Sequence, residues 1–236
     1  AWQCAEARAV WLEKIQNCKK ENDSLTCGRP AGAEKTNPRE FISSVPAMAE
    51  KAGLKASDII VTTDVGQHQM WAAQYYPVEA PRTFLTSGSL GTMGFGLPAA
   101  LGASLANPDK RVVCFSGDGS IMMNIQEMAT LAELNLPVTV VVFKNGTLGM
   151  VYQQQKYLFD KNYSASIFGR QPDLLSIAAG FGIEVVDANK DPEWYKKAFD
   201  MNRQNKPCFV QALVDCEEDV LPFVPGGKAN IDAIRN

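Results

Sequence analysis

Two polar residues that follow apolar runs have the chemistry of metal ligands. Asp118 lies in a glycine turn after the apolar run 112–115, and Asn145 follows the apolar run 138–143. Carboxylate and amide oxygens are donors that Mg²⁺ or Ca²⁺ prefers over softer metals. The glycines beside Asp118 let backbone N–H groups approach an anion. Ser120 is expected to cap a following helix, whose positive end favours phosphate. These residue types predict a metal-bridged diphosphate site.

The two residues are expected to meet because of the elements that precede them. The segment 112–145 alternates strand, glycine turn, helix, strand and polar turn. Parallel strands bring both turns to the carboxyl edge of a sheet, where open α/β sheets bind ligands. A Gly-Asp-Gly turn alone is typical of ordinary loops. The prediction therefore depends on the strand context and on Asn145.

A family resemblance extends this interpretation. Residues 117–120, followed by Asn145, resemble the thiamine diphosphate (ThDP) binding motif of ThDP-dependent enzymes. Other stretches resemble one branch of these enzymes, the large catalytic subunit of acetolactate synthase (acetohydroxyacid synthase), and they are 62–71 (TTDVGQHQMW), 87–98 (SGSLGTMGFGLP), 149–151 (GMV) and 224–227 (VPGG). The likeness covers most of the chain from about Asn37 onward. Together these stretches are more specific than the central motif.

The resemblance implies a role for each matching position. Asp118, Asn145 and the backbone carbonyl of Thr147 would bind Mg²⁺. Gly91 would offer a carbonyl to the cofactor's pyrimidine, and Met93 would be an apolar wedge that keeps the cofactor bent. The full set of implied cofactor-binding residues is Val65, Gln67, His68, Gly91, Met93, Gly117, Asp118, Gly119, Ser120, Asn145, Thr147, Leu148, Gly149 and Met150.

Each of these residues also has a plainer interpretation. His68 is the only histidine, and a lone histidine is more often a surface or core residue than a ligand. Met93 and Met150 are compatible with core positions. The glycine order in 91–96 is wrong for a dinucleotide-binding fingerprint. No residue of this chain is predicted to be catalytic, because the glutamate that activates the pyrimidine belongs to a domain absent from this sequence.

Two positions depart from the family pattern. Lys144 stands where the first residue of an Asn-Asn pair is common, although Asn145 keeps the metal-binding position. Gln154 stands where many plant and fungal relatives carry tryptophan. That position shapes the substrate channel, so channel size and inhibitor response are open.

The resemblance implies an activity and a set of partners. Acetolactate synthase decarboxylates pyruvate and condenses the two-carbon unit with a second 2-keto acid, giving acetolactate or acetohydroxybutyrate for branched-chain amino-acid biosynthesis. The expected cofactors are ThDP and Mg²⁺, with FAD only on a missing middle domain. The expected partners are the pyrimidine-binding domain of a second subunit, in a dimer or larger homo-oligomer, and possible regulatory subunits. Alone, this fragment is expected to be inactive.

Two alternatives stay open. One is another ThDP-dependent decarboxylase or oxidase of 2-keto acids, against which residues 67–74 and 224–227 favour acetolactate synthase. The other is a non-catalytic ThDP-binding or assembly module.

Composition excludes several classes of protein. A net charge of −3 and a pI near 5.3 argue against a general nucleic-acid binder. No apolar run approaches membrane-spanning length, and charges interrupt the N-terminus where a signal peptide would be apolar. The 6 cysteines form no Cys-x-x-Cys pair. A reducing cytoplasm and no zinc site are therefore expected.

The pattern of elements predicts an α/β fold, with a mainly parallel sheet of about six strands and helices on both faces. Residues 1–36 are expected to form a helix (1–20) and a linker (21–36), as the tail of a preceding region, and residues 37–236 the ThDP-binding domain. The expected strands are 58–63, 83–86, 111–116, 138–143, 183–186 and 208–214. The expected helices are 37–51, 66–75, 98–106, 120–132, 149–159, 172–180 and 191–204.

Overall fold

The computed structural model describes residues 5–25, 34–78 and 80–235. The chain divides into two compact units. One unit is Glu34–Val220, and the other contains the chain up to Ala33 and from Leu221 onward. The boundary predicted at residue 37 lies near the start of the larger unit.

A six-stranded sheet forms the centre of the larger unit, and all of its strand pairs are parallel. The strand order is β2-β1-β3-β4-β6-β5. The strands are β1 (Ile59–Thr63), β2 (Phe84–Thr86), β3 (Arg111–Gly117), β4 (Val138–Lys144), β5 (Glu184–Asp187) and β6 (Cys208–Leu213). The predicted fold class is confirmed.

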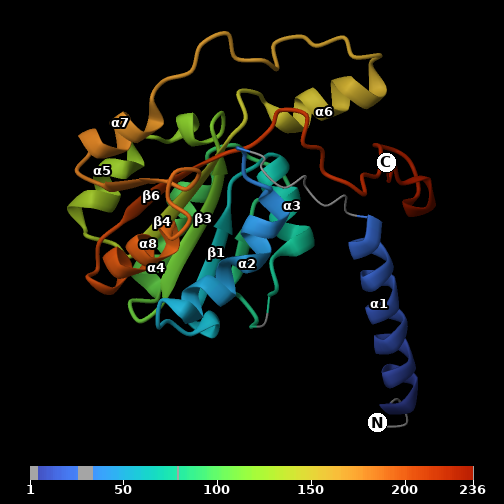
Figure 1. Cartoon of the computed structure of the whole chain (residues 1–236), viewed down its shortest axis with the longest axis horizontal. Helices are drawn as coiled ribbons and strands as arrows, with labels where there is room; N and C mark the ends of the chain where they lie inside the picture. The colour runs from blue at the N-terminus through green and yellow to red at the C-terminus, as the bar shows by residue number, and fades with distance from the viewer. Residues whose placement is uncertain (1–4, 26–33, 79, 236) are drawn as a thin grey trace. The chain divides into compact units, whose positions relative to one another are not determined.

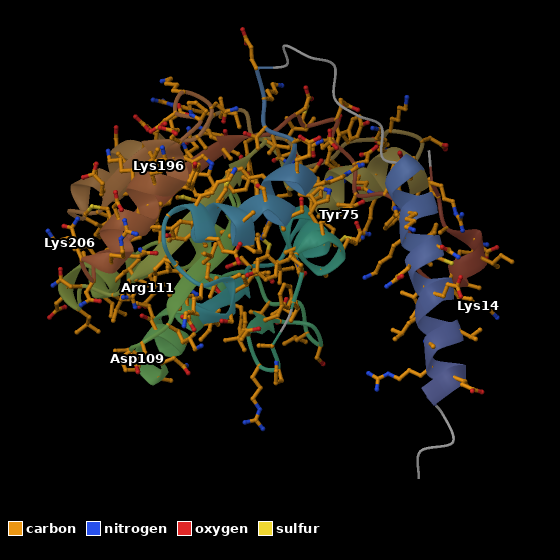
Figure 2. All side chains as sticks on the ribbon, turned by 60° about the horizontal axis from the view of Figure 1, so that its bottom comes forward. Lys14, Tyr75, Asp109, Arg111, Lys196 and Lys206 are labelled. Carbon is orange, nitrogen blue, oxygen red and sulfur yellow. The ribbon has the colours of Figure 1, made fainter. Side chains whose placement is uncertain are left out.

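Helices cover both faces of the sheet (Figure 1). They are α2 (Pro38–Lys51), α3 (Gln67–Tyr75), α4 (Gly96–Ala106), α5 (Glu127–Glu133), α6 (Gly149–Leu158), α7 (Leu174–Gly180) and α8 (Trp194–Arg203). β1, β3, β4 and β6 are buried along nearly their whole length, which explains their continuous apolar runs. Charged side chains such as Asp109, Lys196 and Lys206 are exposed on the surface (Figure 2).

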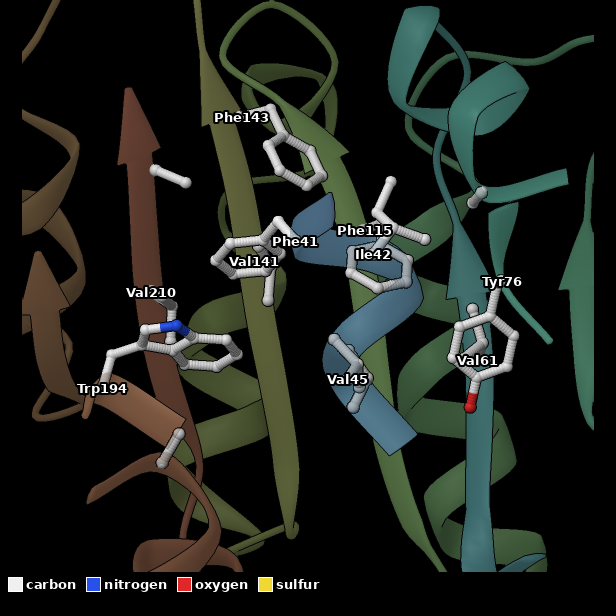
Figure 3. Close-up of a cluster of buried hydrophobic side chains, with 14 of the residues drawn as sticks. Phe41, Ile42, Val45, Val61, Tyr76, Phe115, Val141, Phe143, Trp194 and Val210 are labelled. Carbon is white, nitrogen blue, oxygen red and sulfur yellow. The ribbon is translucent and has the colours of Figure 1, made fainter. Parts of the chain in front are cut away.

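Two hydrophobic cores result, one on each face of the sheet. The first packs residues of α2, α3 and α8 against the sheet. Phe41 of α2 stacks on Trp194 with ring centroids 4.6 Å apart and lies edge-on to Phe143, at the centre of this core (Figure 3). The second core packs residues of α4, α5 and α7 against the opposite face. The sheet is therefore closely packed on both faces, and the loops at its carboxyl edge extend from buried strands.

Side-chain hydrogen bonds mark the starts of two helices. The Asn37 side chain accepts from the backbone N–H groups of Arg39 and Glu40, and Pro38 is the first residue of α2. Asp173 caps α7 by accepting from Ser176 N at 3.2 Å. These caps satisfy N–H groups that a helix start leaves unpaired.

The predicted helix over residues 120–132 is wrong in part. A short 3₁₀ turn (Ile121–Met123) comes first, and α5 begins only at Glu127. Asn124 interrupts the helix with φ −136° and ψ 37°, and its side-chain Nδ2 donates to Gly94 O at 2.7 Å. A tertiary hydrogen bond to the glycine-rich loop therefore overrides the apolar periodicity.

The smaller unit contains α1 (Ala5–Leu25), which extends beyond the predicted end at residue 20 into the predicted linker. Residues 26–33 of that linker lie outside the described part of the chain. Trp11 of α1 is 63% exposed. In the tail, Phe223 and Ile234 form an isolated antiparallel bridge. Within the described ranges, no helix combines the length and apolar character needed to cross a bilayer.

Candidate functional site

The candidate site lies where the chain reverses its direction across the sheet. From β1 the chain moves outward to β2 and then crosses back to β3 on the other side of β1. Open α/β sheets bind ligands in the crevice at such a switch point, beyond the carboxyl ends of the strands. Asp118 and Asn145 lie in the turns after β3 and β4, and His68 lies in the first turn of α3, the helix that follows β1.

A cavity of about 180 Å³ occupies this edge. Its lining contains every predicted cofactor-binding residue except Gly117, the last residue of β3, and Asp118, which follows it. The lining residues are Val65, Gly66, Gln67, His68, Trp71, Gly91, Met93, Gly119, Ser120, Phe143, Asn145, Thr147, Leu148, Gly149, Met150 and Val151. Residues from four separate sequence segments thus converge on one cavity.

Asp118 joins the turn after β3 to the turn after β4. Its Oδ2 accepts from the backbone N–H groups of Asn145 (3.1 Å) and Gly146 (2.8 Å), and from the side chain of Gln171. Asp118 is 5% exposed. Burial raises its pKa, while the bonds from Gln171, Gly146 and Asn145 oppose that rise. The predicted metal ligands Asp118 and Asn145 are therefore adjacent.

The Asn145 amide has a defined orientation. Its Oδ1 accepts from the backbone N–H of Thr147 at 3.0 Å and from the Thr147 hydroxyl at 3.1 Å. Its Nδ2 donates to Gln67 Oε1 at 3.2 Å. The oxygen of Asn145 therefore faces the N–H and hydroxyl of Thr147, the residue whose carbonyl is the third predicted metal ligand.

Ser120 does not have the predicted capping role. No side-chain capping bond is present, and the helical turn that it precedes has only three residues. Its hydroxyl instead accepts from Gly117 N at 3.0 Å and lies 3.1 Å from the Ser116 hydroxyl. Ser120 therefore closes the Gly-Asp-Gly turn, and the three-residue turn that follows it is too short to act as the predicted phosphate-binding helix.

Two ring nitrogens in the cavity wall are unpaired. His68 Nε2 and Trp71 Nε1 are buried and have no hydrogen-bond partner within the described part of the chain. A buried polar atom without a partner costs free energy, so such atoms point to a bound ligand or water. Burial lowers the pKa of His68 to about 4, and the nearby Asp64 carboxylate opposes this shift only in part.

The shifted pKa of His68 predicts a pH-dependent stability. The folded chain keeps His68 uncharged down to pH about 4, whereas the unfolded chain takes up the proton near pH 6.5. The contribution of His68 to the free energy of unfolding is therefore fully present above pH 6.5. It is lost as the pH falls toward 4, which lowers the free energy of unfolding by about 3 kcal/mol. Urea unfolding at pH 7.5, 6, 5 and 4 measures it. His68→Gln is the control and is expected to lose less stability over that range; equal losses in the two proteins would contradict the assignment.

Asp64 is a site residue that the sequence did not single out. It is 1% exposed and directly follows β1. Its Oδ1 accepts from Val65 N (2.8 Å) and Gly94 N (2.9 Å), and its Oδ2 accepts from Gly96 N (2.9 Å). These bonds fasten the loop that carries Gly91 and Met93 over the cavity. An Asp at a strand end, followed by a distant glycine-rich loop, is the only sequence signal for this contact.

We expect Asp64→Asn to lower the free energy of unfolding by about 2 kcal/mol. An amide offers one oxygen where the carboxylate offers two, so an NH₂ group would face a backbone N–H. Chemical denaturation measures the loss. Asp109→Asn, in an exposed turn, is the control and is expected to change stability by under about 0.5 kcal/mol. An Asp64→Asn variant as stable as this control would contradict the anchoring role.

Comparison with known proteins decides the family. Residues 64–212 match the family described as "Thiamine pyrophosphate enzyme, C-terminal TPP binding domain". The chain belongs to this family. Thiamine pyrophosphate is the same cofactor as ThDP, so the predicted recognition is confirmed at this level.

Relatives of the chain carry acetolactate synthase names. The chain is 42% identical over 230 residues to the acetolactate synthase isozyme 1 large subunit of Escherichia coli, covering 98% of the chain and 39% of the relative. It is 42% identical over 232 residues to the acetolactate synthase large subunit of Parasynechococcus marenigrum, covering 98% of the chain and 36% of the relative. The chain thus spans less than two fifths of these relatives.

A solved structure supports the fold alone. The ThDP-dependent 4-hydroxybenzoylformate decarboxylase of Rhodococcus jostii superposes with a TM-score of 0.68 at 22% sequence identity. The match covers 80% of this chain and 34% of that chain.

The residues of the cavity fit ThDP with a hard metal ion. Carboxylate, amide and carbonyl oxygens suit Mg²⁺. Within the described residues, no group of three His, Cys, Asp or Glu side chains that could hold a metal ion occurs, so the Asn145 amide and the Thr147 carbonyl would have to complete a ligand set with Asp118. A Cβ on Gly119 would lie 2.7 Å from Leu148 Cδ2, and a Cβ on Gly149 would lie 2.1 Å from Gln67 Oε1. At Gly149 the Gln67 amide is held by hydrogen bonds, so glycine is needed there for α3 and α6 to approach each other, whereas at Gly119 the end of the Leu148 side chain would have to shift.

Proposed function

We propose that this chain is the ThDP- and Mg²⁺-binding part of an acetolactate synthase large subunit. The observation that carries the proposal is the meeting of Asp118, Asn145 and Thr147 beside the switch-point cavity. The identity with acetolactate synthase large subunits over nearly the whole chain supports this branch of the family.

The chain's own residues would anchor and orient the cofactor. Asp118, Asn145 and the Thr147 carbonyl would hold Mg²⁺, which would neutralise negative charge on the diphosphate. His68 Nε2 and the N–H groups at the start of α6 would face the diphosphate. Met93, in the loop that Asp64 fastens, would support the cofactor rings, and Gly91 would accept from the pyrimidine.

When bound, ThDP supplies the carbanion chemistry that breaks and forms carbon–carbon bonds next to a carbonyl. The substrates would be pyruvate and a second 2-keto acid, and the products acetolactate or acetohydroxybutyrate for branched-chain amino-acid biosynthesis. A glutamate from the pyrimidine-binding domain of a partner subunit would complete the site in a homo-oligomer. FAD would be held outside this chain, and a regulatory subunit is a further possible partner. We place the protein in the cytoplasm on its cysteine usage.

Another ThDP-dependent decarboxylase or oxidase of 2-keto acids would use the same anchor. The anchor alone does not distinguish these activities, whereas the names of the relatives favour acetolactate synthase. Retained Asp118 and Asn145 disfavour a degenerate, non-catalytic module.

The test is a calorimetric titration of the 236-residue chain with ThDP, with and without Mg²⁺. Binding that requires Mg²⁺ supports the cofactor site, and equal affinity in EDTA would contradict it. An acetolactate assay with pyruvate, on the chain joined to the remaining domains of a relative, tests the activity. Acetaldehyde as the sole product would favour a simple decarboxylase.

A further inference from the structure

Buried amide groups connect the Asn145 side chain to the backbone at Val220. Gln67 of α3 and Gln153 of α6 are 3% and 2% exposed, respectively. Gln153 Nε2 donates to Val220 O at 3.0 Å, and Gln153 Oε1 accepts from Val220 N at 2.8 Å. A backbone N–H can only donate and a carbonyl can only accept, so this pair of bonds allows one orientation of the Gln153 amide.

The fixed orientation of Gln153 determines that of Gln67. Gln153 Oε1 can only accept, so Gln67 must present its Nε2, and the two atoms are 3.0 Å apart. The same Nε2 donates to Glu218 O at 3.0 Å, which is a second group that can only accept. Gln67 Oε1 is therefore left to face Asn145.

Gln67 in turn determines the orientation of Asn145. Gln67 Oε1 can only accept, and Asn145 Nδ2 lies 3.2 Å from it. Asn145 Oδ1 is consequently turned away, toward the N–H and hydroxyl of Thr147. The acceptor Gln67 Oε1 and the donors of Thr147 therefore require the same orientation of the Asn145 amide.

We propose that Gln153 is a positioning residue for the metal site, because it fixes through Gln67 which atom of the Asn145 amide is presented as a ligand. The inference rests on the proposed Mg²⁺ and ThDP site. An amide turned by 180° would present NH₂, which cannot bind a cation. Groups that orient metal ligands change metal affinity by about 10–100-fold when they are removed. Gln153 has no place in the cavity lining, so its role is exerted through Gln67.

The first arm of the test uses the chain without any ligand. Gln153→Met keeps the length of the side chain but removes both polar atoms. Asn145→Asp places a carboxylate oxygen against Gln67 Oε1, and Gln67 is prevented from turning by Gln153 and Glu218. We expect Asn145→Asp to lower the thermal unfolding midpoint by roughly 5 °C, and by clearly less in the Gln153→Met background. If Asn145→Asp lowers the midpoint equally in the native and Gln153→Met backgrounds, the proposed coupling of Asn145 to Gln153 through Gln67 is wrong.

The second arm titrates the native chain and Gln153→Met with ThDP over a range of Mg²⁺ concentrations. We expect the Kd for ThDP to rise about 10-fold in the variant at limiting Mg²⁺. Gln204→Met, an exposed glutamine after α8, is the matched control and is expected to bind as the native chain does. Equal Kd values for Gln153→Met and the native chain would overturn the positioning role. If the native chain shows no Mg²⁺-dependent binding of ThDP, the proposed cofactor site is wrong. The first arm then still tests whether Gln153 is coupled to Asn145 through Gln67, because it uses no ligand.

Discussion

Replacing Asp118 with alanine is expected to abolish the Mg²⁺-dependent binding of ThDP by this chain. The loss should exceed about 100-fold in Kd, because removal of even an indirect partner of a metal ligand costs about 10–100-fold. The substitution removes the only charged ligand proposed for the metal. It also removes the acceptor for the N–H groups of Asn145 and Gly146. Calorimetric titration with ThDP at saturating and limiting Mg²⁺ measures both effects.

Two variants separate the loss of the ligand from the loss of the fold. Asp118→Asn keeps an acceptor oxygen for the turn but removes the charge, and it should bind ThDP with intermediate affinity. Asp109→Ala, in an exposed turn, should bind as the native chain does. Circular dichroism of each variant verifies that the sheet is intact. Native-like affinity in a folded Asp118→Ala protein would exclude this carboxylate as a metal ligand.

The alternation of elements was predictable because local signals and burial agree along most of the chain. The apolar runs that became β3 and β4 are buried on both faces of the sheet, so their sequence has no polar alternation. The start of α2 was predictable because Asn37 and Pro38 satisfy the needs of a helix start through local bonds. Where one tertiary bond decides, as between Asn124 and Gly94, the periodicity of the sequence was misleading.

The candidate site was predictable to the extent that its residues follow strand ends. Asp118 and Asn145 come after neighbouring parallel strands, so topology brings them together. The connection from Asn145 through Gln67 to Gln153 was not predictable, because it joins three segments through side-chain amides whose orientation depends on Val220. The role of Asp64 was hidden for the same reason, since Gly94 and Gly96 are distant in the sequence.

Gly149→Ala is expected to weaken Mg²⁺-dependent ThDP binding by about 10–100-fold. The new Cβ would lie 2.1 Å from Gln67 Oε1 and 2.8 Å from Asn145 Nδ2, so both amides must move. Gln67 cannot yield without losing bonds, because its Nε2 is held by Gln153 and Glu218. The substitution therefore separates Asn145 from Gln67, although neither side chain is changed. Titration with ThDP and Mg²⁺ measures the loss.

Gly102→Ala is the matched control for this substitution. Gly102 lies in α4, and a Cβ there would meet nothing within 4 Å. Alanine should stabilise that helix by about 0.5–1 kcal/mol and leave ThDP affinity unchanged. Alanine also favours the helix at Gly149. If the Gly149→Ala protein binds ThDP weakly but unfolds at a temperature no lower than the native chain, the loss of affinity arises in the binding site and not from a less stable fold. A Gly149→Ala protein with native affinity would show that Gln67 can move freely, and the close packing of its amide would then have no part in binding.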